Sequence, residues 1–423
     1  MSGQPAKLAA PLDFESIFGG PLQESTRRTD AQIASRLKIA NTKLVHYPNV
    51  DAVVERLRPS SPIFCFDPAE LRKNALRFQS FPGRVLYAVK CNPHPFILET
   101  LYNVGIRDFD VASIKEVELI ESLFGKSAGM FFNNPAKTRS AIRDASSKFG
   151  IRFYTIDHAS ELKKLLDEAK RDSDLVVAVR LSNSSPDARY ALSKKFGAHP
   201  EEAIELLRAV QRAGIRTGLS FHVGSQCLAP DAFTEALQTC RQVIRRASVP
   251  ISVLNVGGGF PAPYPGDDPV ILDHYFASTI FGYQALQLPP GCLLFCEPGR
   301  ALVATAASVV TQVLLRKDRA VYLNDGVFGS LQELRHPKEK RPVRLIRPGR
   351  GAATRLGAFR AYGPTCDSDD VLGAPIVLPE DVAEGDWIEI GMMGAYSLAM
   401  QTQFNGLSVD QIVAVDNLTQ INS

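Results

Sequence analysis

Residues 84–112 read RVLYAVKCNPHPFILETLYNVGIRDFDVA, in which two apolar, β-branched runs flank a segment with helical periodicity. The runs cover residues 84–90 and 108–112, and the helical segment covers residues 95–104. Parallel strands need a crossover connection, which is usually a helix. The stretch therefore predicts a strand–helix–strand unit with parallel pairing.

The same alternation continues as far as residue 297. The predicted strands are residues 84–90, 108–112, 129–133, 152–156, 174–181, 217–223, 251–256 and 292–297. The predicted helices between them are residues 95–104, 114–124, 138–148, 160–171, 200–213, 231–246 and 269–286. Strands that are apolar throughout are buried on both faces. Eight strands close a (β/α)8 barrel, so we predict an α/β fold with this barrel at its centre.

The sequence changes in character after Arg300. Helical periodicity ends, and Pro and Gly turns separate short predicted strands at residues 308–315, 320–323, 343–347 and 386–390. This pattern indicates a second, all-β domain. The run 62–66 precedes the barrel and is expected to pair with that domain. We thus expect a barrel over residues 67–304 and a discontinuous β domain over residues 41–66 and 305–423. Residues 1–40 form an N-terminal extension, expected to be partly disordered, with a short helix around residues 30–39.

Composition excludes several classes of function. The chain has 423 residues, a net charge of +3 and 45% hydrophobic residues, which is typical of soluble globular proteins. So small a charge gives no support for binding to nucleic acid or to a membrane surface. No apolar run approaches the roughly 20 residues that cross a bilayer, and the N-terminus does not resemble a signal peptide. The seven cysteines lack metal-ligand spacing, which indicates reduced thiols in a cytoplasmic protein without a metal.

Two of the predicted strands are followed by side chains that could bind a cofactor. Lys90 ends the first strand, and the carboxyl ends of barrel strands converge at one mouth. Burial lowers the pKa of such an amine, and lysine forms Schiff bases with aldehydes. His222 and Ser225 follow the sixth strand, where an imidazole can stack on a planar ring and a hydroxyl can bind an anion. Taken singly, a lysine at a strand end is more often solvated, and a lone histidine is more often structural.

The last two barrel strands end in residues suited to a phosphate. The backbone amides of Gly257–Gly259 can bind an anion, although such a run also serves as a tight turn. Glu297 can pair with a protonated pyridine nitrogen, and Arg300 can pair with phosphate. The alternative is a Glu297–Arg300 ion pair that closes the barrel. These residues end different strands, which converge only in a barrel, so they favour a barrel over an open sheet.

Cys366 and Asp367 stand between turn residues of the predicted β domain. A thiol beside a carboxylate there can serve as a proton donor together with a group that recognises an amine. The alternative is an exposed thiol in a surface loop.

Taken together, these motifs resemble the fold-type III pyridoxal-5′-phosphate (PLP) decarboxylases, whose members decarboxylate ornithine, lysine, arginine or diaminopimelate. The chain is most similar to the ornithine decarboxylase branch. The motifs that carry the resemblance are YAVKCN (87–92), FDVAS (109–113), SKKFG (193–197), FHVGS (221–225), GGGF (257–260), EPGR (297–300), NDGVFG (324–329) and GPTCD (363–367).

The resemblance implies that Lys90 carries PLP as a Schiff base, that His222 stacks on its ring and that Glu297 pairs with its pyridine nitrogen. The other residues that it implies for the cofactor site are Asp110, Arg180, Ser225, Gly257, Gly258, Gly259, Gly299, Arg300 and Tyr396. Cys366 would reprotonate the substrate carbon, from the partner subunit of a homodimer with shared sites. The substrate-binding residues that it implies are Asp367, Phe404 and His336. An ion pair between Lys195 and Asp370 is expected across the subunits.

The chain departs from the family pattern after the NDGVFG motif. Ornithine decarboxylases usually carry a Tyr-Asp pair there, whose carboxylate helps to hold the distal ammonium of the substrate. Aligned without gaps, this chain has His336-Pro337 instead, within a basic stretch. A hydrogen bond to a charged group contributes about 1.5–3 kcal/mol, so the loss matters. Asp367 and Asp369 remain, and a short gap would bring Glu333 into the role.

We therefore expect decarboxylation of ornithine or lysine to putrescine or cadaverine, in polyamine biosynthesis. One alternative is a modified or carboxylated diamino acid, such as diaminopimelate, carboxynorspermidine or a precursor of a secondary metabolite. A racemase would need a catalytic tyrosine in place of Cys366 and Asp367. A non-catalytic paralogue, resembling antizyme inhibitors, would have lost the PLP-binding residues that this chain keeps.

Overall fold

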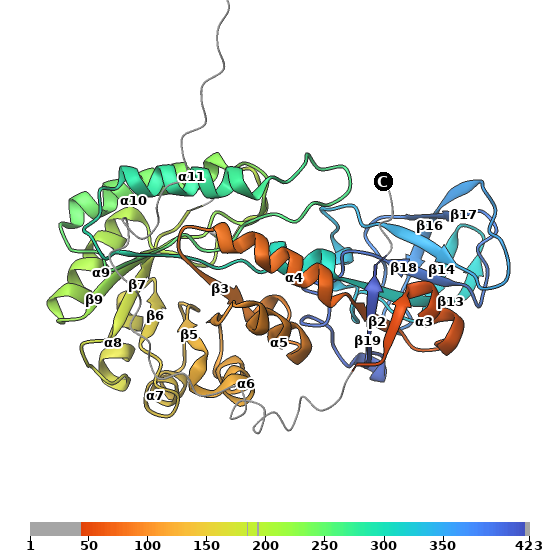
Figure 1. Cartoon of the computed structure of the whole chain (residues 1–423), viewed down its shortest axis with the longest axis horizontal. Helices are drawn as coiled ribbons and strands as arrows, with labels where there is room; N and C mark the ends of the chain where they lie inside the picture. The colour runs from red at the N-terminus through yellow and green to blue at the C-terminus, as the bar shows by residue number, and fades with distance from the viewer. Residues whose placement is uncertain (1–43, 184, 193, 419–423) are drawn as a thin grey trace, which may run out of the picture.

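The computed structural model describes residues 44–183, 185–192 and 194–418. A closed barrel of parallel strands lies at one end of the molecule and a β domain lies at the other (Figure 1). The expected N-terminal extension over residues 1–40, with its short helix, lies outside the described residues, as does Ser193 of the SKKFG motif. None of the described helices is long and apolar enough to cross a membrane.

The barrel contains the predicted eight strands in the predicted order. They are β3 (Arg84–Ala88), β4 (Asp108–Val111), β5 (Gly129–Phe132), β6 (Phe153–Ile156), β7 (Val176–Arg180), β9 (Arg216–Ser220), β11 (Val253–Asn255) and β12 (Leu293–Cys296). The barrel closes where β12 pairs with β3, with Phe295 opposite Arg84 and Cys296 opposite Val85. The predicted (β/α)8 architecture is confirmed.

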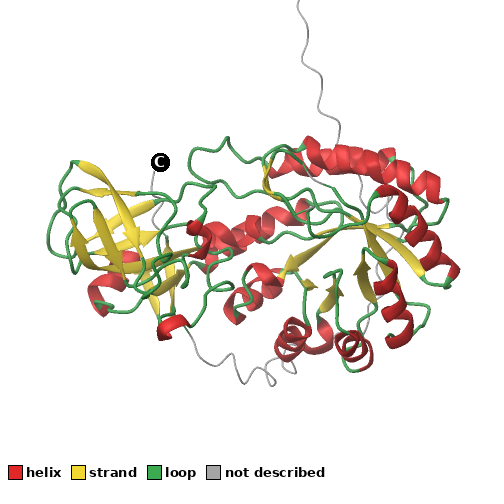
Figure 2. Ribbon diagram, turned by 180° about the vertical axis from the view of Figure 1, so that it is seen from behind, coloured by secondary structure: helices red, strands yellow, loops and turns green. Residues whose placement is uncertain are grey.

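Helices lie outside these strands (Figure 2). They are α4 (Pro68–Arg77), α5 (Pro95–Val104), α6 (Ile114–Phe124), α7 (Arg139–Ser147), α8 (Ala159–Glu168), α9 (Pro200–Arg212), α10 (Asp231–Ala247), α11 (Leu272–Ala285) and α12 (Arg300–Val303). Helix α4 was not predicted, although its start carries a clear signal. The Asp67 carboxylate accepts hydrogen bonds from the N–H groups of Ala69 and Glu70, and Pro68 occupies the first helical position.

Several predicted strands extend past the observed ones at their carboxyl ends. Lys90 lies in a 3-10 turn, η2 (Val89–Cys91), and His222 and Val256 lie in loops. The apolar runs continue because Val89, Val223 and Val256 are fully buried beyond the last paired residue of their strands. Hydrophobicity therefore reports burial in this region, whereas the strand pairing ends sooner.

The interior of the barrel is filled by a layer of apolar side chains. They are Leu86, Phe131, Phe153, Val176, Ala178, Val253 and Phe295. The ring of Phe131 on β5 lies 5.2 Å from that of Phe295 on β12. These strands are separated by β3 and β4 around the barrel, so this contact crosses the interior. Successive side chains of a strand alternate between its faces, so the next inward residues lie towards the barrel mouth.

The β domain is a sheet of nine strands within the described residues. They are β1 (His46–Asn49), β2 (Ile63–Phe66), β13 (Ala307–Lys317), β14 (Ala320–Leu323), β15 (Val343–Ile346), β16 (Leu356–Tyr362), β17 (Ile376–Pro379), β18 (Trp387–Ile390) and β19 (Gln411–Asn417). Strand β2 pairs with β13 and β19, so a segment that precedes the barrel in sequence joins this sheet. The sequence did not indicate β1, β16, β17, β19 or the helix α3 (Val50–Leu57), because these segments are short or only partly apolar.

We expect the apolar layer inside the barrel to contribute strongly to stability. Phe295→Ala removes a ring that is 1% exposed and leaves a cavity among packed aromatic side chains. We expect the free energy of unfolding in urea to fall by about 3–5 kcal/mol. Phe281→Ala on α11 is the matched control, because that ring is 69% exposed. Its effect should stay within about 0.5 kcal/mol, and equal losses from both variants would contradict a packed barrel interior.

Candidate active site

A single cavity at the barrel mouth gathers most of the residues predicted for the cofactor. It is lined by Ala88, Lys90, His222, Ser225, Gly258, Gly259, Phe260, Glu297, Gly299, Arg300 and Tyr396. All of these apart from Ala88 and Phe260 were predicted from the sequence. They come from several barrel strands and from the β domain, and only the tertiary fold brings them together.

Lys90 contributes its amine to this cavity. Its Nζ lies 2.8 Å from Oδ2 of Asp110, which is 1% exposed at the end of β4. Burial by itself lowers the pKa of Lys90, but the negative charge of Asp110, with smaller contributions from Tyr396 and Glu297, raises that pKa above its ordinary value. The expectation of a lowered pKa for this amine is therefore wrong in the absence of a cofactor. The negative charge of Asp110 and its neighbours raises the pKa of Lys90 by more than burial lowers it.

Glu297 is held by two asparagines that sequence reasoning did not select. Its Oε1 accepts hydrogen bonds from Nδ2 of Asn133 at 2.7 Å and from Nδ2 of Asn255 at 2.5 Å. Each amide is oriented by its own oxygen. Asn133 Oδ1 accepts from the Thr155 hydroxyl at 2.8 Å, and Asn255 Oδ1 accepts from the N–H of Gly257 at 2.9 Å. Neither bond uses Oε2 of Glu297, which leaves that oxygen for a ligand.

Burial has the largest effect on the protonation of Glu297 and His222. Burial, reinforced by the neighbouring Asp110, raises the pKa of Glu297 well above its ordinary value. Burial and the positive charges of Arg180 and Lys90 hold the pKa of His222 well below its ordinary value. His222 Nδ1 accepts a hydrogen bond from the N–H of Gly224 at 3.0 Å, which assigns the ring proton to Nε2. His222 is thus a neutral ring in a fixed orientation.

Gly258 and Gly259 of the glycine run line the cavity. Gly257 and Gly259 have φ values of +69° and +112°, which residues with a Cβ rarely adopt. A Cβ on Gly258 would lie 2.7 Å from the Glu297 carbonyl oxygen and 3.0 Å from His222 Nε2. The absence of side chains therefore keeps open a space into which backbone N–H groups and a planar ligand can fit.

Arg300 makes an ion pair that the sequence did not predict. Its guanidinium donates two hydrogen bonds to the Glu333 carboxylate, at 2.9 and 2.6 Å. Arg341 also donates to Glu333, at 2.8 Å, and both arginines donate to the Tyr264 hydroxyl. The alternative Glu297–Arg300 ion pair does not form, because Arg300 pairs with Glu333 instead. The two arginines also engage Glu333, so it is not a free carboxylate for a substrate ammonium.

Tyr396 connects the β domain to the turn that carries Lys90. Its backbone N–H donates to the Cys91 carbonyl at 2.9 Å, and its ring centroid lies 5.0 Å from Cζ of Arg300. Burial raises the pKa of Tyr396, so its phenol is neutral. The residue has a φ of +52°, which is unusual for a non-glycine residue. Such strain is tolerated where surrounding contacts over-determine a functional segment.

The residues predicted to act on the substrate do not line this cavity. Cys366 is exposed, unlike the other six cysteines, and both its Sγ and its backbone N lie 3.3 Å from Asn405 Oδ1. Phe404 precedes Asn405 and is 42% exposed, and Asp367 is also exposed. Cys366 thus contacts the residue that follows Phe404, and none of Cys366, Asp367 and Phe404 lines the cavity that contains Lys90.

His336 lies in a different cavity, which opens at the surface of the β domain. Arg335, Arg360 and Asp369 also line this cavity, and Arg335 forms an ion pair with Asp369 at 3.2 Å. His336 therefore stands among basic side chains, as the basic stretch in the sequence suggested.

Asp370 serves its own loop. It is 2% exposed, and its Oδ1 accepts a hydrogen bond from the Val327 N–H at 2.8 Å. Its Oδ2 accepts from both the N–H and the hydroxyl of Thr365. The burial of this carboxylate argues against the expected ion pair with Lys195 across subunits.

Comparison with known proteins places this site in a family. Residues 69–304 match the model of the pyridoxal-dependent decarboxylase family, pyridoxal binding domain. The chain belongs to the pyridoxal-dependent decarboxylases. Its barrel is thus that of a PLP-dependent decarboxylase, and PLP is its cofactor.

Individual relatives of this decarboxylase cover most of the chain. The lysine/ornithine decarboxylase of Selenomonas ruminantium is 33% identical over 84% of this chain and 90% of its own length. Antizyme inhibitor 2 of Xenopus laevis is 31% identical over 84% of this chain and 80% of its own length. Among solved structures, the lysine/ornithine decarboxylase of Vibrio vulnificus, complexed with putrescine, superposes with a TM-score of 0.74. That chain is 32% identical, and the match covers 87% of this chain and 97% of that one.

The cavity of this decarboxylase fits PLP on three observations. Asp110 has one buried oxygen, Oδ1, without a hydrogen-bond partner among the described residues. The space over Gly258 would be filled by any side chain. The surrounding donors and acceptors, an amine, a carboxylate and a guanidinium, match the aldehyde, ring nitrogen and phosphate of the cofactor.

We expect the buried Arg300–Glu333–Arg341 cluster to stabilise the fold. Glu333→Ala leaves two buried guanidinium groups without their carboxylate. We expect the free energy of unfolding of the cofactor-free protein to fall by about 3–5 kcal/mol, which is typical of a broken buried ion pair. Denaturant titration measures this loss.

The control is Glu201→Ala, which breaks an ion pair with Arg246 at the surface. Its unfolding midpoint should stay close to that of the wild type, because water screens exposed pairs. If Glu333→Ala were equally harmless, the cluster would not be a structural element.

Proposed function

We propose that this enzyme uses PLP on Lys90 to decarboxylate a basic amino acid, ornithine or lysine, and so produces putrescine or cadaverine for polyamine biosynthesis. The observation that carries this proposal is the single cavity in which Lys90, Glu297 and Arg300 meet. The names of the relatives from Selenomonas ruminantium and Vibrio vulnificus support the substrate class. In this proposal residues 67–304 supply the cofactor site, and residues 41–66 and 305–423 supply the groups that meet the substrate.

Each residue around the cavity has a role in this proposal. Lys90 would hold the cofactor aldehyde through its Nζ, and Asp110 lies close enough to take up the proton that the amine would lose. Glu297 would pair with the ring nitrogen, and Asn133 and Asn255 keep its carboxylate in place through Oε1. When bound, PLP withdraws electrons from the α-carbon of the substrate through its ring. A carboxylate beside the ring nitrogen keeps that nitrogen protonated and so favours this withdrawal.

Other residues hold and orient the cofactor. His222 offers a neutral planar ring for stacking, because burial suppresses its protonation. The remaining proposed cofactor-binding residues are Asp110 and Arg180 beside the ring, and Ser225, Gly257, Gly258, Gly259, Gly299, Arg300 and Tyr396 around the phosphate. Because Arg300 also holds Glu333, its guanidinium is fixed before a phosphate arrives. A donor held in place loses less freedom on binding.

Cys366 is proposed to give a proton to the substrate carbon after CO2 leaves. It is exposed and lies outside the cavity of its own chain, so it would act on the site of a second subunit. We therefore propose a homodimer with two shared sites, in which Asp367 and Phe404 contact the substrate. All seven cysteines are free thiols, which agrees with the cytoplasmic location that we also propose.

A second candidate substrate is a diamino acid with a modified or carboxylated distal end. Arg335, His336 and Arg360 line one surface cavity together with Asp369. This excess of basic groups suits an acidic substituent better than a second ammonium. A racemase finds less support, because Cys366 and Asp367 stand where a catalytic tyrosine would be needed. A non-catalytic paralogue is disfavoured, because the cavity retains Lys90, His222, Glu297 and Arg300 together.

The test of this function is CO2 release from a panel of amino acids by PLP-reconstituted protein. The panel contains L- and D-ornithine, lysine, arginine, diaminopimelate and carboxylated polyamines. We expect release from L-ornithine or L-lysine and a visible absorption band of bound PLP. Lys90→Ala should lose both, because no other described amine lines the cavity. Release from diaminopimelate alone would favour the second candidate, and a wild-type protein without the absorption band would overturn the proposal.

Cys366→Ala tests the shared site. We expect slower decarboxylation or misplaced protonation, measured as incorporation of solvent deuterium and by the product ratio. The absorption band of bound PLP should stay intact, because Cys366 does not line the cofactor cavity. Sedimentation of the wild type should give a dimer. Loss of cofactor binding in this variant would contradict the assigned role, and a fully active monomer would contradict the shared site.

A further inference from the structure

Lys137 is a buried amine that the proposed chemistry does not use. It lies in the loop between β5 and α7, and its side chain is 0% exposed. It does not line the cofactor cavity. A lysine is rarely buried without partners, because removing its charge from water is costly.

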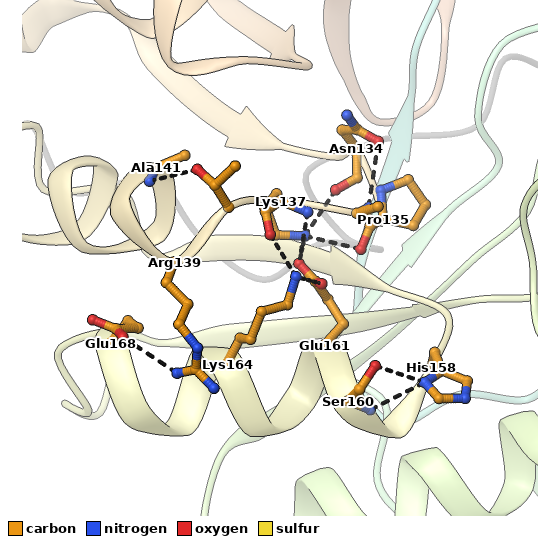
Figure 3. Close-up of polar contacts among 12 residues, drawn as sticks. Asn134, Pro135, Lys137, Arg139, Ala141, His158, Ser160, Glu161, Lys164 and Glu168 are labelled. Carbon is orange, nitrogen blue, oxygen red and sulfur yellow. Dashed lines mark hydrogen bonds and ion pairs between the residues drawn. The ribbon is translucent and has the colours of Figure 1, made fainter.

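The amine of Lys137 has an acceptor for each of its protons, and Figure 3 shows those in Asn134 and Glu161. Its Nζ donates to the carbonyl oxygens of Asn134 and Thr155, both at 2.7 Å, and lies 3.1 Å from Oε1 of Glu161. The Pro135 carbonyl lies further away, at 3.4 Å. Glu161 also accepts from the backbone N–H of Lys137 at 3.0 Å. The ammonium form therefore joins three segments, namely the loop after β5, the strand β6 and the helix α8.

These contacts cross a poorly paired seam of the barrel. Strands β5 and β6 share a single registered pair, Phe132 with Tyr154, whereas the neighbouring β4–β5 and β6–β7 ladders have four each. Few backbone hydrogen bonds thus fix the carboxyl ends of β5 and β6 relative to each other. Lys137 supplies a connection at this place, because Asn134 follows β5 and Thr155 belongs to β6.

The same two strand ends support Glu297. The Thr155 hydroxyl donates to Asn133, and the Asn133 amide donates to Glu297. Asn133 is 7% exposed and Thr155 is 2% exposed, so in the folded barrel each depends on protein groups rather than on water for its hydrogen bonds. A shift of β5 against β6 would move the Asn133 amide away from Oε1 of Glu297.

The charge of Lys137 is balanced on the helix side. Glu161 also forms an ion pair with Lys164, which donates to the Lys137 carbonyl oxygen (Figure 3). Burial lowers the pKa of Lys137 to about 8, although Glu161 opposes this effect, and Lys164 lowers and Asp157 raises it further. At neutral pH the amine therefore keeps the third proton that its three acceptors require.

We propose that Lys137 is a positioning residue, which joins β5 to β6 and thereby holds Asn133 against Glu297, the carboxylate that pairs with the cofactor ring. The inference rests on the proposed role of Glu297. Lys137 touches neither substrate nor cofactor, and it acts through the orientation of one amide.

Lys137→Met tests the proposal in the PLP-reconstituted enzyme, because methionine keeps the length of the side chain without its charge. We expect kcat to fall roughly 10- to 100-fold with little change in KM, since a misplacement of about 1 Å near the reacting atoms costs on the order of 100-fold. The visible absorption spectrum of bound PLP should change in the same way as in Asn133→Ala. Glu161→Gln, which keeps the shape of its side chain, should cause a smaller change in the same direction, and it carries the test if Lys137→Met does not fold.

Lys164→Met is the matched control. It removes the other ion pair of Glu161 without touching either strand end, so it should lower thermal stability and leave kcat and the absorption spectrum unchanged. If Lys137→Met behaved like Lys164→Met, Lys137 would only stabilise the fold and the proposal would be wrong.

A double variant tests the route through Asn133. Lys137→Met should cause little further loss of kcat in an Asn133→Ala background, because residues that act in one chain of contacts are not additive. Multiplied losses would overturn the proposal. Glu297→Gln separates this failure from that of the proposed function. If Glu297→Gln left kcat and the absorption spectrum unchanged, the role of Glu297 itself would be wrong.

Discussion

Closure of eight parallel strands into one barrel forces their inward side chains into layers, and the rest of the molecule depends on this constraint. The lower layer consists of packed apolar side chains, among them Phe131, Phe153 and Phe295. Side chains alternate along a strand, so the inward residues of the next layer lie two positions later. Two positions after Phe131, Phe153 and Phe295 stand Asn133, Thr155 and Glu297, respectively. The polar floor of the site therefore rests directly on the packed interior.

A polar layer at such a place is stable only if its groups bond to one another, because water is excluded. In this structure the bonding partners come from several barrel strands and from the β domain. Two asparagine amides hold Glu297, Lys90 pairs with Asp110, and Arg300 is fixed by Glu333 of the β domain. The site is thereby built before the cofactor binds, and the inference about Lys137 extends the same logic to the seam between β5 and β6.

Much of this arrangement could be predicted from the sequence. Each barrel strand is a local apolar run, and Lys90, Glu297 and Arg300 stand directly after such runs. Asn133 and Asn255 carry a similar signal, since each lies at or next to the end of a predicted strand, two positions after an inward apolar residue. Glu333 and Arg341 carry no such signal. Glu333 meets Arg300 only because the β domain folds against the barrel, across 33 positions of sequence, and Arg341 joins them by donating to Glu333.

By itself, the sequence determined the eight strands, the change to an all-β domain and the order of the chemical groups, because each depends on residues close together along the chain. Only the tertiary structure decided which groups meet. It paired Arg300 with Glu333 rather than with Glu297, buried Asp370 in its own loop, and raised the pKa of Lys90 where burial by itself would have lowered it. The physical reason is that the strength of a charge–charge interaction depends on distance and on the exclusion of water, and folding sets both.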